Sequence, residues 1–312
     1  MNKKEEYVTR IHLKREKSDV RKELINKCLN SDSENQFLAL GWSNIYGDDK
    51  EKEINSYEDF YKLAKKEGEK TNPALNVFCD AKKNDLFWTR DLDGIYWICR
   101  VKEKARNHLD KRLDIGASLA VEAYKVGIDV PGAIKASFNR PQGGTVHKIR
   151  DKQIIEYSKY VYNLKSETCQ YKYEKKEGEL LDNLPDFELE ELVISYLQLK
   201  ENYYVLSNSI ANKSTTIKIE CELITREIAK EGSKPQRAVV QVKGGKTGIK
   251  VEDYKTYLER GYMVYLYAAE IEYIDNLENI IEITRKDLKE FYKEYERNLP
   301  ESITRWKELI KE

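Results

Sequence analysis

The order of predicted elements in the second half of the chain restricts the fold more than any other feature. Hydrophobic spacing predicts a helix after Pro185, with Leu189 and Val193 on its inner face. Polar and apolar residues alternate from Ile217 to Ile224, which is typical of a strand with one buried face. The series reads helix 187–199, strands 203–206, 217–224 and 237–243, helix 251–260 and strand 262–268. This order predicts an α/β domain.

The third of these strands ends in a triplet of chemical interest, Gln241-Val242-Lys243. Residues two apart on a strand share a face, so Gln241 and Lys243 point the same way. Glu220 is expected across from them, because residues 225–234 read as the loop of a hairpin. A metal-dependent phosphodiesterase needs oxygen ligands for Mg²⁺ and a cation beside the reacting phosphate. An acid on one strand and Gln-x-Lys on its neighbour supply both.

This arrangement resembles the PD-(D/E)xK nucleases, and in particular their Mrr-like branch, in which the triplet is Gln-x-Lys. That branch also carries a glutamate on the first core helix, in a pattern like Phe-Glu-x-Leu-Val. The stretch 189–193 reads Leu-Glu-Glu-Leu-Val and matches it with leucine in place of phenylalanine. The resemblance implies a restriction-endonuclease-like α/β core with a mixed sheet, which cuts DNA with Mg²⁺, or with Mn²⁺ as a substitute. By carry-over the catalytic residues are Glu190, Glu220, Gln241 and Lys243, and the metal ligands are Glu220, Gln241 and the carbonyl of Val242.

Two of these assignments have a competing neighbour. Glu222 lies on the same strand face as Glu220, and relatives often carry aspartate in a glycine-rich context there. Glu191 can replace Glu190 if the helix register differs by one residue. The sequence leaves both choices open. The glycines after Lys243 predict a turn where the backbone approaches DNA closely, with Lys246 as a phosphate contact.

The first half of the chain has a different pattern. A Gly-Trp step at Trp42 and the segment 85–101, with Asp93-Gly94 as its turn, predict a small closed β-barrel with flanking helices. It resembles the PUA/EVE-like barrels, which implies recognition of nucleic acid and of a flipped, modified base between aromatic rings. Packing in the core is the alternative reading for each aromatic residue. The expected base contacts are Trp42, Trp88, Trp97 and Phe138, and the expected phosphate contacts are Arg90, Arg100, Lys135, Arg140 and Lys148.

The length and charge of the chain limit its domain organisation and its mode of binding. Its 312 residues predict two domains, and its 55 basic and 55 acidic residues give no net charge. Any binding of phosphate groups must therefore depend on local basic patches. We expect an α+β recognition domain over 1–163, a polar linker over 164–183 and the nuclease domain over 184–312. The five scattered cysteines favour reduced thiols and no zinc site, and the lack of a secretory signal or long apolar run predicts a cytoplasmic protein away from membranes.

Together these features predict a Mg²⁺-dependent DNA endonuclease that acts in restriction or anti-phage defence, with modification-dependent cleavage as one form of it. We expect a homodimer or higher homo-oligomer, because one site per chain cuts one strand, and we consider a defence-system partner protein. Two alternatives stay open. One is an inactive nuclease fold that only binds nucleic acid, and the other is an enzyme directed at RNA.

Overall fold

The chain forms two compact units, Met1–Glu174 and Lys175–Glu312, in an α+β structure. The computed structural model describes residues 6–14, 17–30, 35–47, 54–67, 73–140, 144–208, 219–226, 235–273 and 278–311. The boundary between the units falls inside the stretch expected as a linker. That stretch holds regular structure, because it includes the end of one helix, a short strand and a one-turn helix. No helix in the described part of the chain is both long and apolar enough to cross a bilayer.

The first unit is built on one sheet in the order β2-β6-β4-β3-β1-β7, with β5 also paired to β6. Strands β1 and β3 are parallel, and the other pairs are antiparallel. The hairpin predicted over 85–101 is β3 and β4, and Gly94 adopts the positive φ of its turn. The strands are β1 Val8–Ile11, β2 Phe37–Leu40, β3 Leu86–Arg90, β4 Tyr96–Val101, β5 Arg106–Asp110, β6 Ile115–Gly127 and β7 Val146–Ile149.

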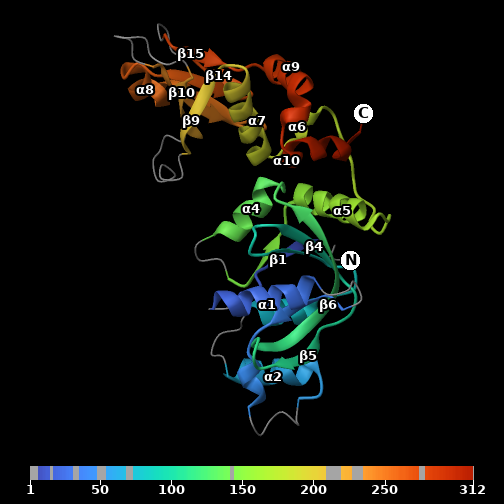
Figure 1. The fold of residues 1–312 in the computed structure, drawn as a ribbon. Helices are drawn as coiled ribbons and strands as arrows, with labels where there is room; N and C mark the ends of the chain where they lie inside the picture. Colours follow the sequence, from blue (N-terminus) through green and yellow to red (C-terminus); the bar gives the residue numbers. More distant parts are fainter. Residues whose placement is uncertain are drawn as a thin grey trace. The chain divides into compact units, whose positions relative to one another are not determined.

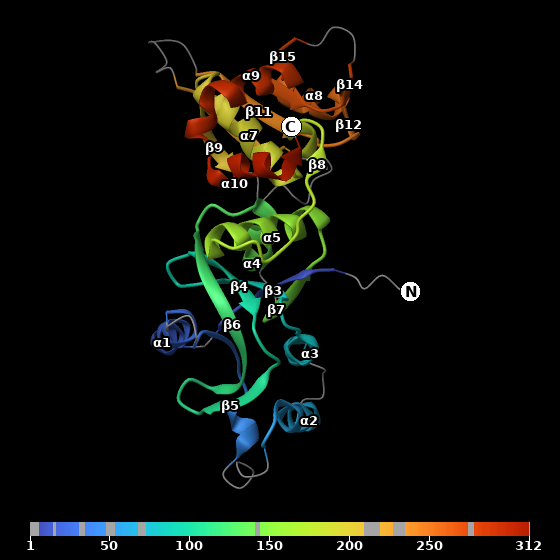
Figure 2. The same cartoon turned by 90° about the vertical axis from the view of Figure 1, so that its right-hand side faces the viewer.

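The sheet is a curled half-barrel (Figure 1; Figure 2), and not the closed barrel expected from the sequence. Its end strands β2 and β7 are not paired with each other in the described residues. The reason lies in β6, whose 13 residues pair with β4 over the later half and with β2 and β5 over the earlier half. The sheet therefore extends along β6 instead of closing on β7.

Helices cover this sheet, and local signals explain where they begin. Ser56 and Asp59 exchange side-chain and backbone hydrogen bonds at the start of α2, which is typical of a helix N-cap. Asp151 accepts from the backbone of Gln153 and caps α5, which packs on β4 and β6. The helices are α1 Ser18–Leu29, η1 Ser43–Tyr46, α2 Tyr57–Glu67, α3 Pro73–Asp80, α4 Gly132–Asn139 and α5 Lys152–Ser166.

The second unit has a mixed five-stranded sheet in the order β15-β13-β11-β10-β9. Strands β9, β10 and β11 are antiparallel neighbours, whereas β11, β13 and β15 are parallel. The element order predicted for residues 187–268 is present, with the helix near 251–260 split into η3 and α8. The sheet strands are β9 Tyr203–Asn208, β10 Cys221–Thr225, β11 Arg237–Val242, β13 Met263–Tyr267 and β15 Ile280–Glu282.

Helix α7 packs on β9 and β11, and α8 packs on β13. Between β11, β13 and η3, apolar residues such as Val239, Val264 and Tyr254 form a buried cluster. The helices are α6 Leu180–Asn183, α7 Asp186–Leu199, η3 Val251–Tyr254, α8 Lys255–Glu259, α9 Arg285–Tyr295, η4 Glu296–Asn298, α10 Glu301–Thr304 and η5 Arg305–Leu309. Short strands pair at the margins: β12 Gly248–Lys250 with β14 Glu270–Glu272, and β8 Lys176–Glu177 with β16 Ile310–Lys311.

Candidate functional site

The pairing of β10 and β11 brings Glu220 to Gln241. Glu220 lies just before β10, and its backbone N–H donates to the carbonyl of Val240 at 2.8 Å, which prolongs the antiparallel ladder by one residue. Gln241 is two residues from Val239 and so shares the face of the η3 cluster. The side chains of Glu220 and Gln241 consequently meet at the end of the two strands.

The Gln241 amide is fixed by three hydrogen bonds. Its Nε2 donates to Glu220 Oε1 at 2.6 Å and to the Val242 carbonyl at 3.0 Å. Its Oε1 accepts from the Tyr254 hydroxyl at 3.2 Å. Only 1% of Gln241 is exposed, so each of these bonds satisfies a buried polar group. Two oxygens, one from Glu220 and one from Val242, therefore face a single point.

The Glu220 carboxyl group is held between opposing influences. Burial raises its pKa, while the positive charge of Lys243 and hydrogen bonds from the Val242 backbone, the Gln241 side chain and the Glu190 side chain lower it. Lys243 is held close by its backbone N–H, which donates to the Tyr267 carbonyl at 2.8 Å.

The structure separates the residues that the sequence left as alternatives. The Glu222 carboxylate pairs with Arg237 at 2.5 Å and accepts from the Tyr262 hydroxyl at 3.0 Å. The Glu191 carboxylate accepts from Ser302 at 3.4 Å, on α10. Glu190 and Glu220, rather than their neighbours, are the acids that meet beside Gln241.

The donors at this point suit a hard divalent cation. Carboxylate, amide and backbone carbonyl oxygens are the ligands that Mg²⁺ takes in proteins. No three His, Cys, Asp or Glu side chains gather as a metal site in the described parts of the chain, so Gln241 and Val242 must complete any such set. At present the amide turns Nε2 toward Glu220. A half-turn of the amide would present Oε1 instead, and the Tyr254 hydroxyl can then accept where it now donates.

Two contacts at the edge of this site have no signal in the local sequence. Tyr254 is buried and its hydroxyl fixes the amide, yet nothing in the local pattern of η3 distinguishes it from a core tyrosine. Gly244 lies against α7, where an added Cβ would collide with the Asp186 carboxylate. Gly244 therefore packs against α7 of the same unit, and Lys246 is exposed on the turn that follows.

The first unit uses most of its candidate aromatic residues for packing. Trp88 is 0% exposed, and its indole N–H donates to Ser158 at 2.9 Å. Trp97 is buried and donates to Asp91 at 2.9 Å, and Phe138 is buried as well. None of these rings presents a free face to a base, which corrects the expectation that they form its walls. Trp42 is half-buried against the core and adopts a left-handed φ of 67°.

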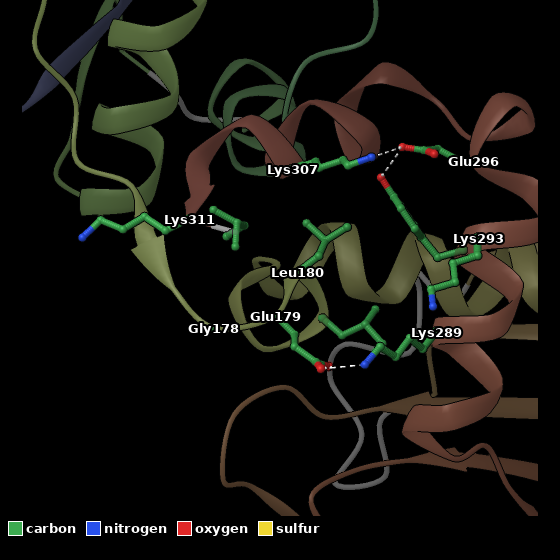
Figure 3. A pocket seen from close by; sticks show the side chains of 11 residues that line it. Gly178, Glu179, Leu180, Lys289, Lys293, Glu296, Lys307 and Lys311 are labelled. Carbon is green, nitrogen blue, oxygen red and sulfur yellow. Dashed lines mark hydrogen bonds and ion pairs between the residues drawn. The ribbon is translucent and has the colours of Figure 1, made fainter.

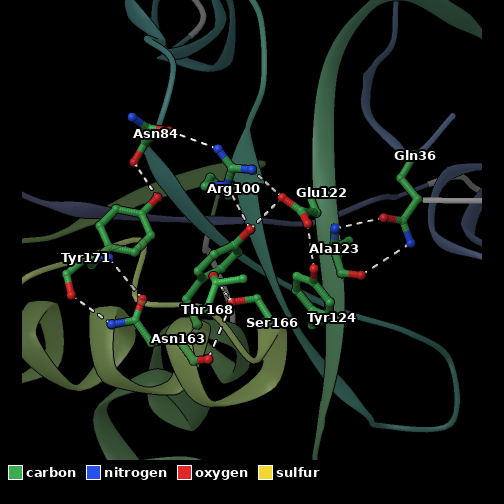
Figure 4. Close-up of polar contacts among 11 residues, drawn as sticks. Gln36, Asn84, Arg100, Glu122, Ala123, Tyr124, Asn163, Ser166, Thr168 and Tyr171 are labelled. Atoms are coloured by element: carbon green, nitrogen blue, oxygen red, sulfur yellow. Dashed lines mark hydrogen bonds and ion pairs between the residues drawn. The ribbon is translucent and has the colours of Figure 1, made fainter. Parts of the chain in front are cut away.

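Arg100, one of the expected phosphate contacts, belongs to an internal network (Figure 4). Its guanidinium pairs with Glu122, donates to the Tyr162 hydroxyl at 2.7 Å and donates to Asn84 at 3.0 Å. Arg100 therefore forms a structural ion pair with Glu122 in this unit. The Lys148 ammonium lies over the Tyr7 ring, 4.2 Å from its centroid.

The remaining basic candidates of the first unit have no carboxylate partner in the described residues. Lys135 is half-buried on α4 and Arg140 is exposed just after it. Arg90 donates to the Tyr96 hydroxyl at 3.3 Å and to Asn139 at 3.1 Å. These contacts leave the charge of Arg90 uncompensated by an acid.

A pocket of about 360 Å³ lies elsewhere in the second unit, between the β8–α6 turn, α9 and the C-terminal segment (Figure 3). Lysines line it, but Glu179 holds Lys289 at 2.6 Å and Glu296 holds Lys307 at 3.2 Å. It shares no lining residue with the Glu220 site. Two of its four lysines are paired with its two glutamates, and we assign the pocket no ligand.

Comparisons with known proteins add little to this geometry. No protein-family model matches the chain, and no curated protein matches it. One solved structure, titled DNA modification-dependent restriction endonuclease AspBHI, aligns with 71% of this chain and 67% of its own length, at 8% identity and a TM-score of 0.24. A likeness at this TM-score carries no argument, so the case for function depends on the site itself.

Proposed function

We propose that the second unit is a metal-dependent phosphodiesterase of restriction-endonuclease-like fold that cleaves DNA. The observation that carries the proposal is the meeting of the Glu220 and Val242 oxygens at the Gln241 amide. Glu190 hydrogen-bonds to the same carboxyl group, and the charge of Lys243 acts on it. Oxygen donors and one cation at the end of paired strands are what phosphodiester hydrolysis requires.

Each residue has a distinct part in this proposal. Glu220, the Val242 carbonyl and the turned Gln241 amide would hold Mg²⁺ or Mn²⁺, and Glu190 would complete the site. A bound divalent ion supplies charge stabilisation at the phosphate and lowers the pKa of water. Lys243 would orient the attacking water and offset the negative charge that develops on the phosphate. Tyr254 would hold the amide in its turned position.

The choice of DNA as the substrate follows the resemblance to Mrr-like nucleases. On the same ground we propose a role in restriction or anti-phage defence, with the first unit as a reader of DNA that includes Trp42, Arg90 and Arg140. We further propose a homodimer or higher homo-oligomer, because two sites are needed to cut both strands. A partner protein of the defence system belongs to the same proposal.

The test is a Mg²⁺-dependent nicking assay on supercoiled plasmid, with Lys243→Ala as the decisive variant. We expect its rate to fall by about a hundredfold or more, as for removal of a group that stabilises transition-state charge. Lys255→Ala, at an exposed lysine of the same unit, and Glu222→Gln, at the neighbouring acid, are the matched controls. Unchanged thermal unfolding of Lys243→Ala would show that the loss is chemical.

The same assay separates the alternatives. Nicking by Lys243→Ala at the wild-type rate removes the proposed role of this lysine. Wild-type protein that binds duplex but never nicks it, with either Mg²⁺ or Mn²⁺, identifies a binding module. A structured RNA in place of the plasmid, cleaved while the plasmid stays intact, identifies an RNA-directed enzyme.

A further inference from the structure

Arg10 is a buried cation at the centre of the first unit. It lies on β1, between β3 and β7, and only 1% of it is exposed. Its Nη1 donates to the carbonyls of Gly144 at 2.6 Å and Thr145 at 3.3 Å, while its Nε is buried and meets no hydrogen-bond acceptor in the described residues. Burial of a guanidinium is costly unless an anion or full hydrogen bonding compensates it.

Further cations gather around Arg10 instead of acids. The guanidinium carbons of Arg10 and Arg90 lie 5.8 and 5.5 Å from the centroid of the Phe138 ring, and His12 meets this ring edge-on at 5.0 Å. Arg21, from α1, donates its Nε to the Leu13 carbonyl at 3.0 Å. The group thus draws on β1, β3, α1 and α4.

The same cations act on one another electrostatically. Burial and then the charge of Arg140 lower the pKa of Arg10 to about 10. Burial lowers the pKa of His12 to about 3, with the charges of Arg10, Lys14, Arg90 and Arg21 acting in the same direction. The charged neighbours that perturb these two residues are all basic. An isolated positive field of this kind attracts anions.

Several other arginines in the chain form ion pairs with carboxylates. Arg100 pairs with Glu122 and Arg112 with Glu23 in the same unit, and Arg285 pairs with Asp182 in the second. By contrast, no described ion pair includes any member of the group Arg10, Arg21, Arg90 and Arg140. This cluster has no carboxylate partner among the described ion pairs, and one of its members is buried. It is therefore suited to bind an anion from outside the chain.

We propose that Arg10, Arg21, Arg90 and Arg140 form a binding site for a phosphate group, as a free ion, a monoester or the diester of a nucleic acid. Guanidinium groups donate in a planar fork that fits phosphate oxygens, and a cluster of them is the usual protein device for that anion. Arg10 and Arg90 would contact the phosphate from the Phe138 side, and the exposed Arg140 would meet it at the surface. This site belongs to the first unit and does not depend on the metal site proposed above.

The test measures binding by the full chain in EDTA, so that cleavage plays no part. Isothermal titration is run with inorganic phosphate, with adenosine monophosphate and with a short DNA duplex. The variants are Arg90→Gln and Arg140→Gln, with Arg112→Gln as the control, because Arg112 is exposed and has its own carboxylate in the same unit. Arg10→Met is added only if its thermal unfolding matches the wild type.

We expect at least one of the three ligands to bind, with affinity about tenfold lower in Arg90→Gln and Arg140→Gln and unchanged in Arg112→Gln. Binding of inorganic phosphate or the monophosphate indicates a small-molecule source, and binding of the duplex alone indicates the nucleic-acid backbone. The proposal is overturned if none of the three binds at about 10 mM phosphate groups, a level that would detect weak association. It is equally overturned if both variants bind as tightly as the control.

Discussion

At the scale of single residues, one amide decides what the Glu220 site can hold. Gln241 now donates to the Glu220 and Val242 oxygens, which are the proposed ligands of a cation. It also accepts a hydrogen bond from Tyr254. The same atoms support both orientations, because a hydroxyl group donates or accepts and an amide has one end of each kind. The uncharged amide group bridges the Glu220 and Val242 oxygens by hydrogen bonds. Glutamate at this position would instead place a second charge against Glu220.

His12 leads to a prediction about pH. In the unfolded chain its imidazole takes up a proton near pH 6.5, whereas in the folded unit burial and the surrounding arginines lower its pKa to about 3. Between these values the unfolded state binds more protons, so the free energy of unfolding falls as the pH falls. One such proton contributes a slope of about 1.4 kcal/mol per pH unit.

The measurement is urea unfolding of the wild type and of His12→Asn at several pH values from about 7 to about 4. We expect the difference in stability between the two proteins to shrink as the pH falls, because the variant lacks this proton. His108 and His147, whose pKa values burial also lowers, contribute equally to both proteins and cancel in the difference. A difference that stays constant across the range contradicts the assigned burial of a neutral imidazole.

At the scale of elements, β6 and β11 organise the two units. Strand β11 has β10 on one side and β13 on the other, which places Gln241 and Lys243 at a point that three strands reach. Strand β6 joins the two halves of the first sheet, and it passes close to its neighbours at Gly116. A Cβ there would lie 2.5 Å from the Gly41 carbonyl oxygen and 2.6 Å from Phe60 Cε2.

We therefore expect Gly116→Ala to lower the free energy of unfolding by about 1–3 kcal/mol, the usual cost of overpacking a filled interior. Denaturant unfolding of the full chain measures this loss. Gly144→Ala is the control, because its added Cβ would meet nothing closer than 3.9 Å and it keeps the carbonyl that Arg10 uses. Equal stability of the two variants would mean that β6 has room to shift away from Phe60.

At the scale of the whole molecule, charge that sums to zero is distributed unevenly. The chain has 55 basic and 55 acidic residues, and several of its described arginines, such as Arg100 and Arg285, have a carboxylate partner. No described ion pair includes Arg10, Arg21, Arg90 or Arg140 of the first unit, while Glu190 and Glu220 meet beside Gln241 in the second. Each unit thus carries one of the two proposed sites, the first for a phosphate anion and the second for a divalent cation.

The second of these sites has a consequence for overall stability. A ligand that binds only the folded chain raises the free energy of unfolding, by about 2.7 kcal/mol at a hundred times its Kd. We expect Mg²⁺ or Mn²⁺ to raise the unfolding midpoint of the wild type and EDTA to reverse it. Glu220→Gln should abolish the increase, while Glu222→Gln should keep it. An increase of the same size in Glu220→Gln would place the ion elsewhere.

The sequence alone determined the element types and the spacing of the second unit. Period-two alternation and helical spacing are local properties, and they placed α7, β9, β10, β11 and β13 within a few residues of their observed bounds. The hairpin of β3 and β4 was equally predictable, because turn residues act on their own backbone. Strand β6 is harder to read, since residues 115–119 are buried on both faces and alternation begins only after them.

Only the tertiary structure decided which side chains meet. Glu190 and Glu191, or Glu220 and Glu222, are equivalent in local pattern, and they differ only because strand register and helix packing turn one of each pair toward Gln241. Trp88 became a core residue and Arg10 a buried cation for the same reason. The meeting of these side chains depends on contacts between residues far apart in the chain. The free energy of such contacts cannot be predicted from any short stretch of sequence.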